Sequence, residues 1–179
     1  PHSEPYLGVR QNGAEPGCMV LSLSACSTIV DHRLNLLNNF TPDSTTGIEV
    51  GKVVSNSGKT IESDMRLETM LQEALRGQLE RADLLWHNTF SRKLVCDCKI
   101  LDYEEGNAFK RILFPGWGAT RLTIQCNLHQ EGQLVGTIDS KRTIFGGGID
   151  TIGAWRYIFA NVAEDLSQNL RQKGFARTD

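Results

Sequence analysis

The sequence predicts an α+β fold, in which an antiparallel sheet carries two amphipathic helices on one face. Three patterns predict it: segments of alternating apolar and polar residues, two longer segments whose apolar residues recur every three or four positions, and glycine-containing turns between them. The expected order is strand, helix, strand, strand, strand, helix (β-α-β-β-β-α). Helices gathered on one face of an antiparallel sheet are typical of α+β domains.

The domain boundary is predicted near residue 46. Residues 1–45 are expected to form an irregular amino-terminal arm, since they contain several glycines, four prolines and a single apolar run at 18–30. Residues 46–179 are then expected to form one α+β sandwich domain, which is long enough to bury a core of its own.

The first predicted strand and helix follow this boundary. Residues 48–54 are rich in β-branched side chains and end at the turn sequence Ser-Asn-Ser-Gly of 55–58. From residue 63 to about residue 85, apolar residues recur at helical spacing while charged residues fall on other faces. Ser63 is predicted to cap the amino terminus of this helix.

Three strands and a helix complete the predicted domain. Residues 92–102, 121–129 and 134–144 alternate apolar and polar side chains, and the sequence Gln-Glu-Gly-Gln before the last of them predicts a hairpin turn. Residues 151–172 carry one apolar stripe that predicts the final helix, with Gly174 as its stop.

Charge and hydropathy exclude two classes of partner. Nineteen basic against 21 acidic residues leave a formal net charge of −2, which offers no broad positive field to a nucleic acid. No apolar run reaches the roughly 20 residues that a membrane-spanning helix needs. We therefore expect no nucleic-acid partner and no helix that spans a membrane.

The five cysteines contain no Cys-x-x-Cys pair and the four histidines are scattered, so no metal or cofactor site is predicted. Cys96 and Cys98 share the inward face of one predicted strand, and Cys126 lies on the inward face of the next. These residues are either buried thiols or a disulfide that joins Cys126 to one of the other two. A catalytic cysteine is not expected, because the sequence places no histidine beside one.

Two further clusters have a structural and a functional interpretation. The glycines at 146–148 precede a helix but lack the Lys-Ser/Thr of a phosphate-binding loop, which favours a flexible turn. Asp102, Glu104 and Glu105 gather at a strand end, where they form either a solvated edge or a cation or acid/base site. No motif pairs a nucleophile with a base, so no catalytic residue is predicted.

An apolar-rich connection runs from residue 103 to residue 120 and contains Phe109, Phe114 and Trp117. It joins two strands with polar outer faces, so it either folds back over the sheet or is offered to a partner. Under the second alternative these three aromatic residues bind the partner.

A resemblance to known proteins rests on the second half of the chain. Residues 108–172 read AFKRILFPGWGATRLTIQCNLHQEGQLVGTIDSKRTIFGGGIDTIGAWRYIFANVAEDLSQNLRQ, and combine an arginine before a glycine-containing loop, two alternating strands, a Gly-rich run and a final amphipathic helix. This pattern resembles a family of bacterial envelope lipoproteins of unknown function. Over residues 48–173 the chain is similar to the periplasmic βα-sandwich of the curli-secretion lipoprotein and to the amino-terminal domain of the translocation protein TolB.

The arm carries a second resemblance, in the segments EPYLGVRQN and MVLSLSACSTIVDHRLNLL. They resemble small outer-membrane lipoproteins of the YceK/YidQ type, whose pattern is Tyr-x-Gly-Val/Thr-Arg, an apolar stretch, and an aspartate followed by leucines. Tyr6, Arg10 and Asp31 match, whereas Ser22 and Ser24 depart from the family's usual Asp and Pro. Because an extended arm suits strand addition to a neighbour, Tyr6 and Arg10 are predicted to bind a partner.

The sequence Leu-Ser-Ala-Cys at 23–26 reads like a lipobox, at which a lipoprotein signal peptide is cut and its cysteine lipidated. A signal peptide also needs a basic region and an apolar run of about 7 to 15 residues, and only about eight mostly apolar residues precede Cys26. Either Cys26 is the lipidated residue, or residues 18–30 are an internal buried segment and the lipidated cysteine lies upstream of Pro1.

Both resemblances imply a lipoprotein of the periplasm, associated with the outer membrane. The leading interpretation is a non-enzymatic structural subunit of an envelope assembly, such as a secretion channel or a pilus or flagellar ring. Its partners would be other envelope proteins and copies of itself. The alternative is a free-standing periplasmic lipoprotein that binds a ligand or modulates an enzyme. The mass of the protein in solution separates the two.

Overall fold

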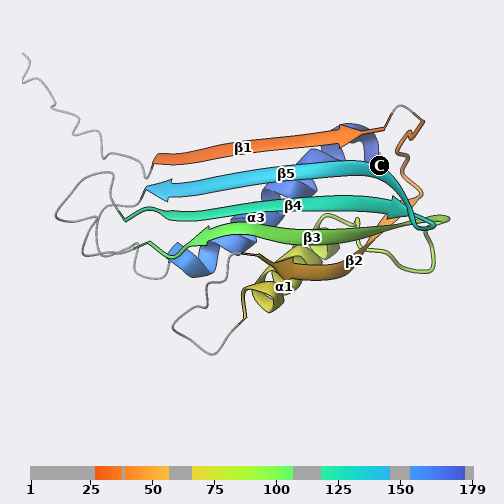
Figure 1. The fold of residues 1–179 in the computed structure, drawn as a ribbon. Helices are drawn as coiled ribbons and strands as arrows, with labels where there is room; N and C mark the ends of the chain where they lie inside the picture. The colour runs from red at the N-terminus through yellow and green to blue at the C-terminus, as the bar shows by residue number, and fades with distance from the viewer. Residues whose placement is uncertain (1–26, 38, 57–65, 107–117, 146–153, 176–179) are drawn as a thin grey trace, which may run out of the picture.

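The computed structural model of the chain describes residues 27–37, 39–56, 66–106, 118–145 and 154–175 (Figure 1). No helix among them is long and apolar enough to cross a membrane. Along the chain, these residues form β1 (Ser27–Leu36), β2 (Thr46–Ser55), α1 (Leu67–Arg81), β3 (Arg92–Glu104), β4 (Thr120–Gln130), β5 (Gln133–Phe145), α3 (Ala154–Leu170) and the π-helical turn η2 (Arg171–Phe175).

The five strands form one mixed sheet in the order β1-β5-β4-β3-β2. Neighbouring strands run antiparallel except β2 and β3, which are parallel. The prediction of an α+β fold is confirmed, but the prediction of a wholly antiparallel sheet is wrong at this pair. The reason is α1, because a helical crossover returns the chain to the end of the sheet where β2 began, and the next strand then runs the same way.

The strand β1 corrects the prediction that the arm is irregular as far as residue 45. It is the edge strand of the sheet and pairs with β5 from Ser27 opposite Phe145 to Leu36 opposite Gly136. Its sequence alternates only weakly, because Leu34 is its one buried side chain among those described and the first half of the strand is exposed. A strand whose side chains are buried only at one end shows little of the apolar and polar alternation from which a strand is predicted.

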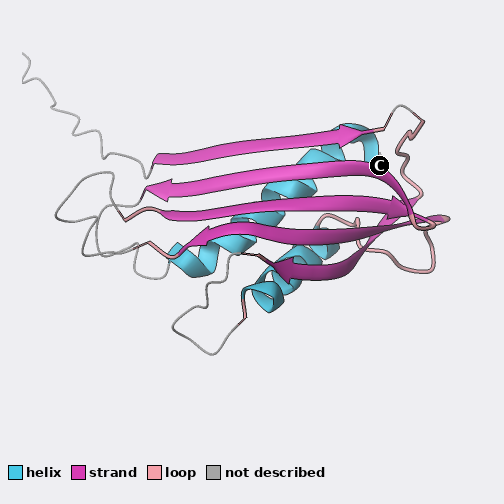
Figure 2. Cartoon of the chain, in the orientation of Figure 1, coloured by secondary structure: helices cyan, strands magenta, loops and turns pink. Residues whose placement is uncertain are grey.

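Both helices cover the same face of the sheet (Figure 2). The residues of α1 that face the sheet are leucines at every fourth position, and each leucine buried in this way stabilises the fold by about 2 kcal/mol relative to an exposed one. The buried side chains of the two helices are Leu67, Leu71, Leu75 and Leu79 on α1 and Ile158, Phe159, Val162, Ala163, Leu166, Ser167 and Leu170 on α3.

The helices end where the backbone leaves the right-handed region. After α1, Asp83 adopts a φ of 57°, and the helix predicted to reach about residue 85 stops at Arg81. After α3, Gly174 adopts a φ of 95°, which glycine reaches without strain, at the stop that the sequence predicts. The predicted cap Ser63 lies outside the described residues.

The sheet has one apolar and one polar face. Its apolar face packs on α1 and α3 through the alternating residues of the central strands, which are Leu94, Cys96, Cys98 and Ile100 on β3 and Leu122, Ile124, Cys126 and Leu128 on β4. The opposite side is called the open face below, because both helices lie behind it (Figure 2). The open face therefore presents the polar half of each strand.

Candidate functional site

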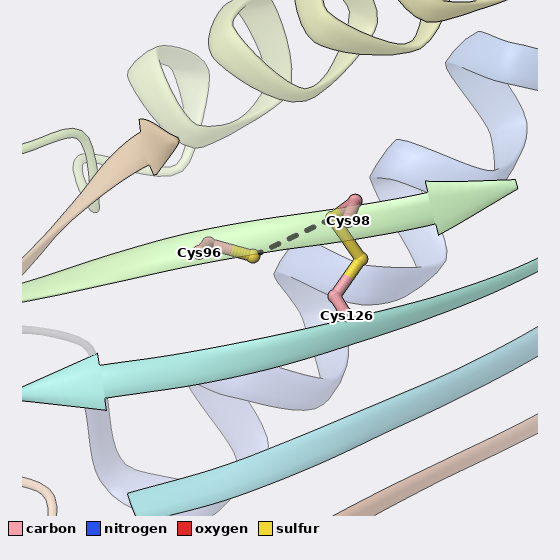
Figure 3. A group of neighbouring side chains, drawn as sticks. All are labelled: Cys96, Cys98 and Cys126. Atoms are coloured by element: carbon pink, nitrogen blue, oxygen red, sulfur yellow. Dashed lines mark hydrogen bonds between the residues drawn. A yellow bond between two sulfur atoms is a disulfide. The ribbon is translucent and has the colours of Figure 1, made fainter. Parts of the chain in front are cut away.

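Three cysteines meet in the core between the sheet and the helices (Figure 3). Cys98 on β3 lies directly opposite Cys126 on β4, and their sulfurs form a disulfide with a Cα–Cα distance of 4.0 Å. The Sγ of Cys96, on the same face of β3, lies 3.7 Å from the Sγ of Cys98. Of the alternatives that the sequence leaves open, the structure joins Cys98 to Cys126, since these two residues share one position of the register.

The free thiol of Cys96 is poorly suited to chemistry. Burial in the core raises its pKa to about 12, and the neighbouring carboxylate of Asp97 adds to the rise. The reactive thiolate is therefore scarce at neutral pH. Within the described part of the chain, the three cysteines are the one group of three or more ligating side chains close enough to share a metal ion, and two of these sulfurs are already bonded to each other.

A largely buried polar cluster joins β1, β5 and α3. His32 on β1 contacts Ser140 on β5 through Nδ1 at 2.9 Å, and Asp165 on α3 through Nε2 at 3.3 Å. Arg142, on the same face of β5 as Ser140, donates to the Asp165 carboxylate at 2.5 Å and to the backbone carbonyl of Asn161 at 3.4 Å. The side chains of His32, Arg142 and Asp165 are each at most 16% exposed.

In space, Ser140, His32 and Asp165 are arranged like the nucleophile, base and acid of a hydrolase triad, because Ser140 contacts one ring nitrogen of His32 and Asp165 contacts the other. The surroundings favour a structural role. Ser140 is 2% exposed and faces the helix layer, so its hydroxyl does not meet solvent, and Asp165 is shared with the guanidinium of Arg142. The cluster fastens the edge strand β1 to the last helix.

Sequence reasoning missed this cluster because no local pattern marks it. His32 and Ser140 are 108 residues apart and become neighbours only when β1 pairs with β5. One signal was present: Ser140 and Arg142 occupy inward positions of a strand whose other inward positions hold Ile138 and Ile144. Polar side chains at inward positions of a strand require partners, and those partners lie on β1 and α3.

The two edges of the sheet differ in how much of their backbone is open to pairing with another strand. At the β2 edge, the backbone N–H of Ile48 donates to the carbonyl of Leu84 at 2.8 Å, and that of Trp86 donates to the carbonyl of Ile48 at 2.9 Å. Beyond this contact the strand bulges between Val50 and Val53. A covered and bulged edge is protected against pairing with another strand.

The β1 edge has neither protection. It ends the sheet, and no strand of the described chain pairs with its outer side. Ile29 and Val30 in this strand are 59% and 42% exposed. An exposed strand edge with apolar side chains is a template for pairing with another chain.

Charged residues of the open face alternate in sign between β1 and β5. Asp31 lies opposite Lys141, and Arg33 lies opposite Asp139. Asp139 also accepts a hydrogen bond from Gln125 of β4 at 2.9 Å. Asp31, Arg33, Asp139 and Lys141 line an open depression of about 280 Å³ on the face of the sheet. The polar rows therefore run to the edge of the sheet and end there at Asp31 and Arg33.

The acidic residues singled out in the sequence lie at the end of β3. Glu104 pairs with Arg121 of β4 at 2.9 Å, which gives one member of the group a structural partner. Asp102 and Glu105 join no potential metal-binding group among the described residues. The remaining predicted site residues lie outside the described chain, and they are Tyr6, Arg10, Cys26, Phe109, Phe114 and Trp117.

Solved structures share this fold. The PelC dodecamer from Paraburkholderia phytofirmans matches with a TM-score of 0.52 and 10% sequence identity, over 84% of this chain and 100% of the PelC chain. A point variant of that dodecamer, in another crystal form, matches with a TM-score of 0.51 and 12% identity over the same shares. At these identities the likeness shows the fold alone.

No curated protein matches the sequence. A family model described as "Domain of unknown function (DUF4410)" matches residues 27–148, and this segment contains all five strands of the sheet together with α1. Because the match covers more than half of the chain, the protein belongs to the DUF4410 family.

Proposed function

We propose that this chain is a non-enzymatic structural subunit of a bacterial cell-envelope assembly, in which several copies of it pack together. The observation that carries the proposal is the fold shared with PelC, a protein solved as a dodecamer whose whole chain is covered by the match. A subunit that binds copies of itself commonly forms a closed symmetric oligomer. A secretion channel or a pilus or flagellar ring is the kind of assembly that such a subunit would serve.

The described surface supports packing through the sheet. The open face is polar and lies on the side away from both helices, and no strand of the described residues pairs with the outer side of the edge strand β1. A second chain can use either of them without disturbing the core. The aromatic residues Phe109, Phe114 and Trp117, and the arm residues Tyr6 and Arg10, remain proposed contacts to other envelope proteins.

The positions of the nucleophilic groups support a non-enzymatic role. The side chains of Ser140 and Cys96 are 2% and 1% exposed, so a substrate has no access to either. The charged side chains Lys93 and Arg121 pair with Glu49 and Glu104 across neighbouring strands. Cross-strand pairs of this kind stabilise a sheet rather than converge on a ligand.

The disulfide between Cys98 and Cys126 supports a location in the periplasm, because disulfides persist in oxidising compartments and are rare in the cytosol. A lipid anchor on Cys26, or on a cysteine upstream of Pro1, would hold the protein at the outer membrane. The likeness to the curli-secretion and TolB type of domain, and to the YceK/YidQ type of arm, points to the same compartment.

Crosslinking in the native cell, followed by separation of the outer membrane, tests this proposal. We expect the outer-membrane fraction to contain crosslinked species at multiples of the mass of the uncrosslinked protein. A soluble periplasmic protein from the same cells is the control for crosslinking by chance. Recovery of the uncrosslinked chain alone, or recovery outside the envelope, would overturn the proposal and favour a free-standing ligand-binding or enzyme-modulating lipoprotein.

A further inference from the structure

We infer that the outer edge of β1 binds the β1 edge of a second copy, antiparallel, about a two-fold axis at His32. The inference rests on the proposed self-assembly and names the contact through which two copies join. It follows from the outer edge of β1, which pairs with no strand among the described residues, from the alternation of side chains along the strand, and from the charges at positions 31 and 33.

The protected β2 edge directs the contact to β1. A head-to-tail contact would place β1 of one copy against β2 of the next. The stretch around Ile48 on β2 already bonds to Leu84 and Trp86, and the following residues form a bulge. A contact of β1 with the partner's β1 uses the unprotected edge on both sides. The two surfaces are then the same, as a two-fold contact requires.

The alternation of side chains limits the register. Opposed residues of an antiparallel pair point to the same face, so the open face continues into the second copy only where two odd-numbered or two even-numbered residues meet. With the axis at His32, Asp31 lies opposite the partner's Arg33, and Arg33 lies opposite the partner's Asp31.

Two neighbouring registers also place odd-numbered residues opposite odd-numbered ones, but they bring like charges together. An axis at residue 31 places Asp31 against the partner's Asp31, and an axis at residue 33 places Arg33 against the partner's Arg33. Like charges directly opposite each other destabilise a sheet, whereas opposite charges stabilise it. The charges of β1 therefore select the axis at His32.

The selected register extends a pattern that the sheet already contains. Within one copy, Lys141 lies opposite Asp31, and Asp139 lies opposite Arg33. Across the contact, a row reads Lys141, Asp31, the partner's Arg33 and the partner's Asp139, so that the sign alternates without a break. In the single chain, Nε of Arg33 and Oδ1 of Asp31 form an ion pair at 3.6 Å. Their side chains stay 74% and 59% exposed, so both can pair with a second copy instead.

Apolar residues meet on the other face of the strand in the same register. Val30, which is 42% exposed, lies opposite the partner's Leu34, which is 9% exposed, and Thr28 lies opposite the partner's Leu36. The contact thus covers the apolar side chain of Val30, which a single copy leaves in water. The axis residue His32 is turned toward Ser140 and Asp165 of its own copy, which holds β1 in place before a partner arrives. A strand that is already ordered loses little entropy on binding.

Charge reversal in the purified full chain tests the register. Asp31→Arg leaves two positive residues on the strand edge, and Arg33→Asp leaves two negative ones, so each variant repels its own copy and complements the other. By sedimentation velocity, we expect each variant alone to self-associate about tenfold more weakly than the wild type, and an equimolar mixture to associate like the wild type. The double variant also restores opposite charges across the contact, but it places like charges opposite Lys141 and Asp139 of its own β5, so it should recover association only in part.

Two reversals elsewhere serve as matched controls. Arg76→Glu and Glu80→Arg change exposed charges of the same size and sign on α1, and they should leave the association unchanged. Association of the double variant also shows that both substitutions are compatible with folding.

The outcomes separate this inference from the proposed function. A wild type that self-associates while both single variants and their mixture behave identically to it overturns the β1 contact alone. A mixture that fails to recover association also overturns the contact. A wild type that stays monomeric overturns the proposed function, and the contact with it.

Discussion

The Nε2 atom of His32 on β1 lies 3.3 Å from the carboxylate of Asp165 on α3. The same carboxylate accepts a hydrogen bond from Arg142 on β5 at 2.5 Å, so one acidic side chain joins the last helix to the edge strand β1 and to its neighbour β5. An edge strand is paired on one side only and depends on such contacts more than a central strand does. This carboxylate therefore matters for the stability of the fold and for the strand edge that we propose to bind a second copy.

Asp165→Asn should lower the free energy of unfolding by about 2 to 4 kcal/mol, because it leaves the guanidinium of Arg142 largely buried without its counter-charge. Urea denaturation measures the loss. Amide hydrogen exchange, compared between variant and wild type, should become faster in β1 by a larger factor than in β4. The control is Glu164→Gln, an exposed neighbour on the same helix, which should change stability by less than about 0.5 kcal/mol. Equal effects of the two substitutions would contradict a role for the cluster.

The Cys98–Cys126 disulfide should stabilise the fold by about 3 kcal/mol, since it closes a loop between residues 28 positions apart. We expect Cys126→Ala to lower the urea midpoint, and we expect a reducing agent to lower the midpoint of the wild type but not that of the variant. Cys96→Ala is the control, because it removes a neighbouring sulfur and keeps the disulfide. If the urea midpoint of the wild type stayed the same after addition of the reductant, the disulfide would be contradicted.

Cys96 should resist alkylation in the folded protein. Its pKa is raised to about 12 by burial, so neither the thiolate nor the side chain is available to iodoacetamide at neutral pH. Peptide-resolved mass spectrometry should find Cys96 unmodified under native conditions and fully modified after unfolding in guanidinium. Rapid labelling of this cysteine in the native state would show that the core is open at β3.

Asp43 should make stability depend on acid pH. Hydrogen bonds from the hydroxyls of Thr45 and Thr46 and from the backbone of Thr45, together with the charge of Arg92, hold its pKa below the usual 3.8 despite some opposing desolvation. A carboxyl whose folded pKa is lowered stabilises the fold above its unfolded pKa, and this contribution is lost as the pH falls through the folded value.

The substitution Asp43→Ala should therefore cost about 1 kcal/mol near neutral pH, a modest value because the side chain is 42% exposed and screened by solvent. The difference in the free energy of unfolding between variant and wild type should become smaller as the pH falls below about 3.8. Urea denaturation at several pH values measures it. A difference that stays constant with pH would rule out the carboxylate as its source.

The strands in the middle of the sheet could be predicted from the sequence, and the strand at its edge could not. Alternation predicts strands at 121–129 and 134–144, and the structure has them at Thr120–Gln130 and Gln133–Phe145. Each has one face on the helices and one open face, which makes a period of two clear. The edge strand β1 lacks that contrast, because the side chains of its first half are exposed on both faces.

Contacts between segments that are far apart in the sequence could not be predicted from local patterns. The parallel pairing of β2 with β3 depends on how the chain crosses over α1, and alternation looks the same in either direction. Cys98 and Cys126 could be recognised as inward residues, but their pairing needed the register of two strands. The His32, Ser140 and Asp165 contacts required three elements to be placed at once.

Sedimentation equilibrium of the purified full chain tests the central claim, that this protein works as a self-assembling subunit joined through β1. We predict a species whose mass is an even multiple of the 19.9 kDa chain, because a two-fold contact brings copies together in pairs. A single species of 19.9 kDa at every concentration examined would contradict the account.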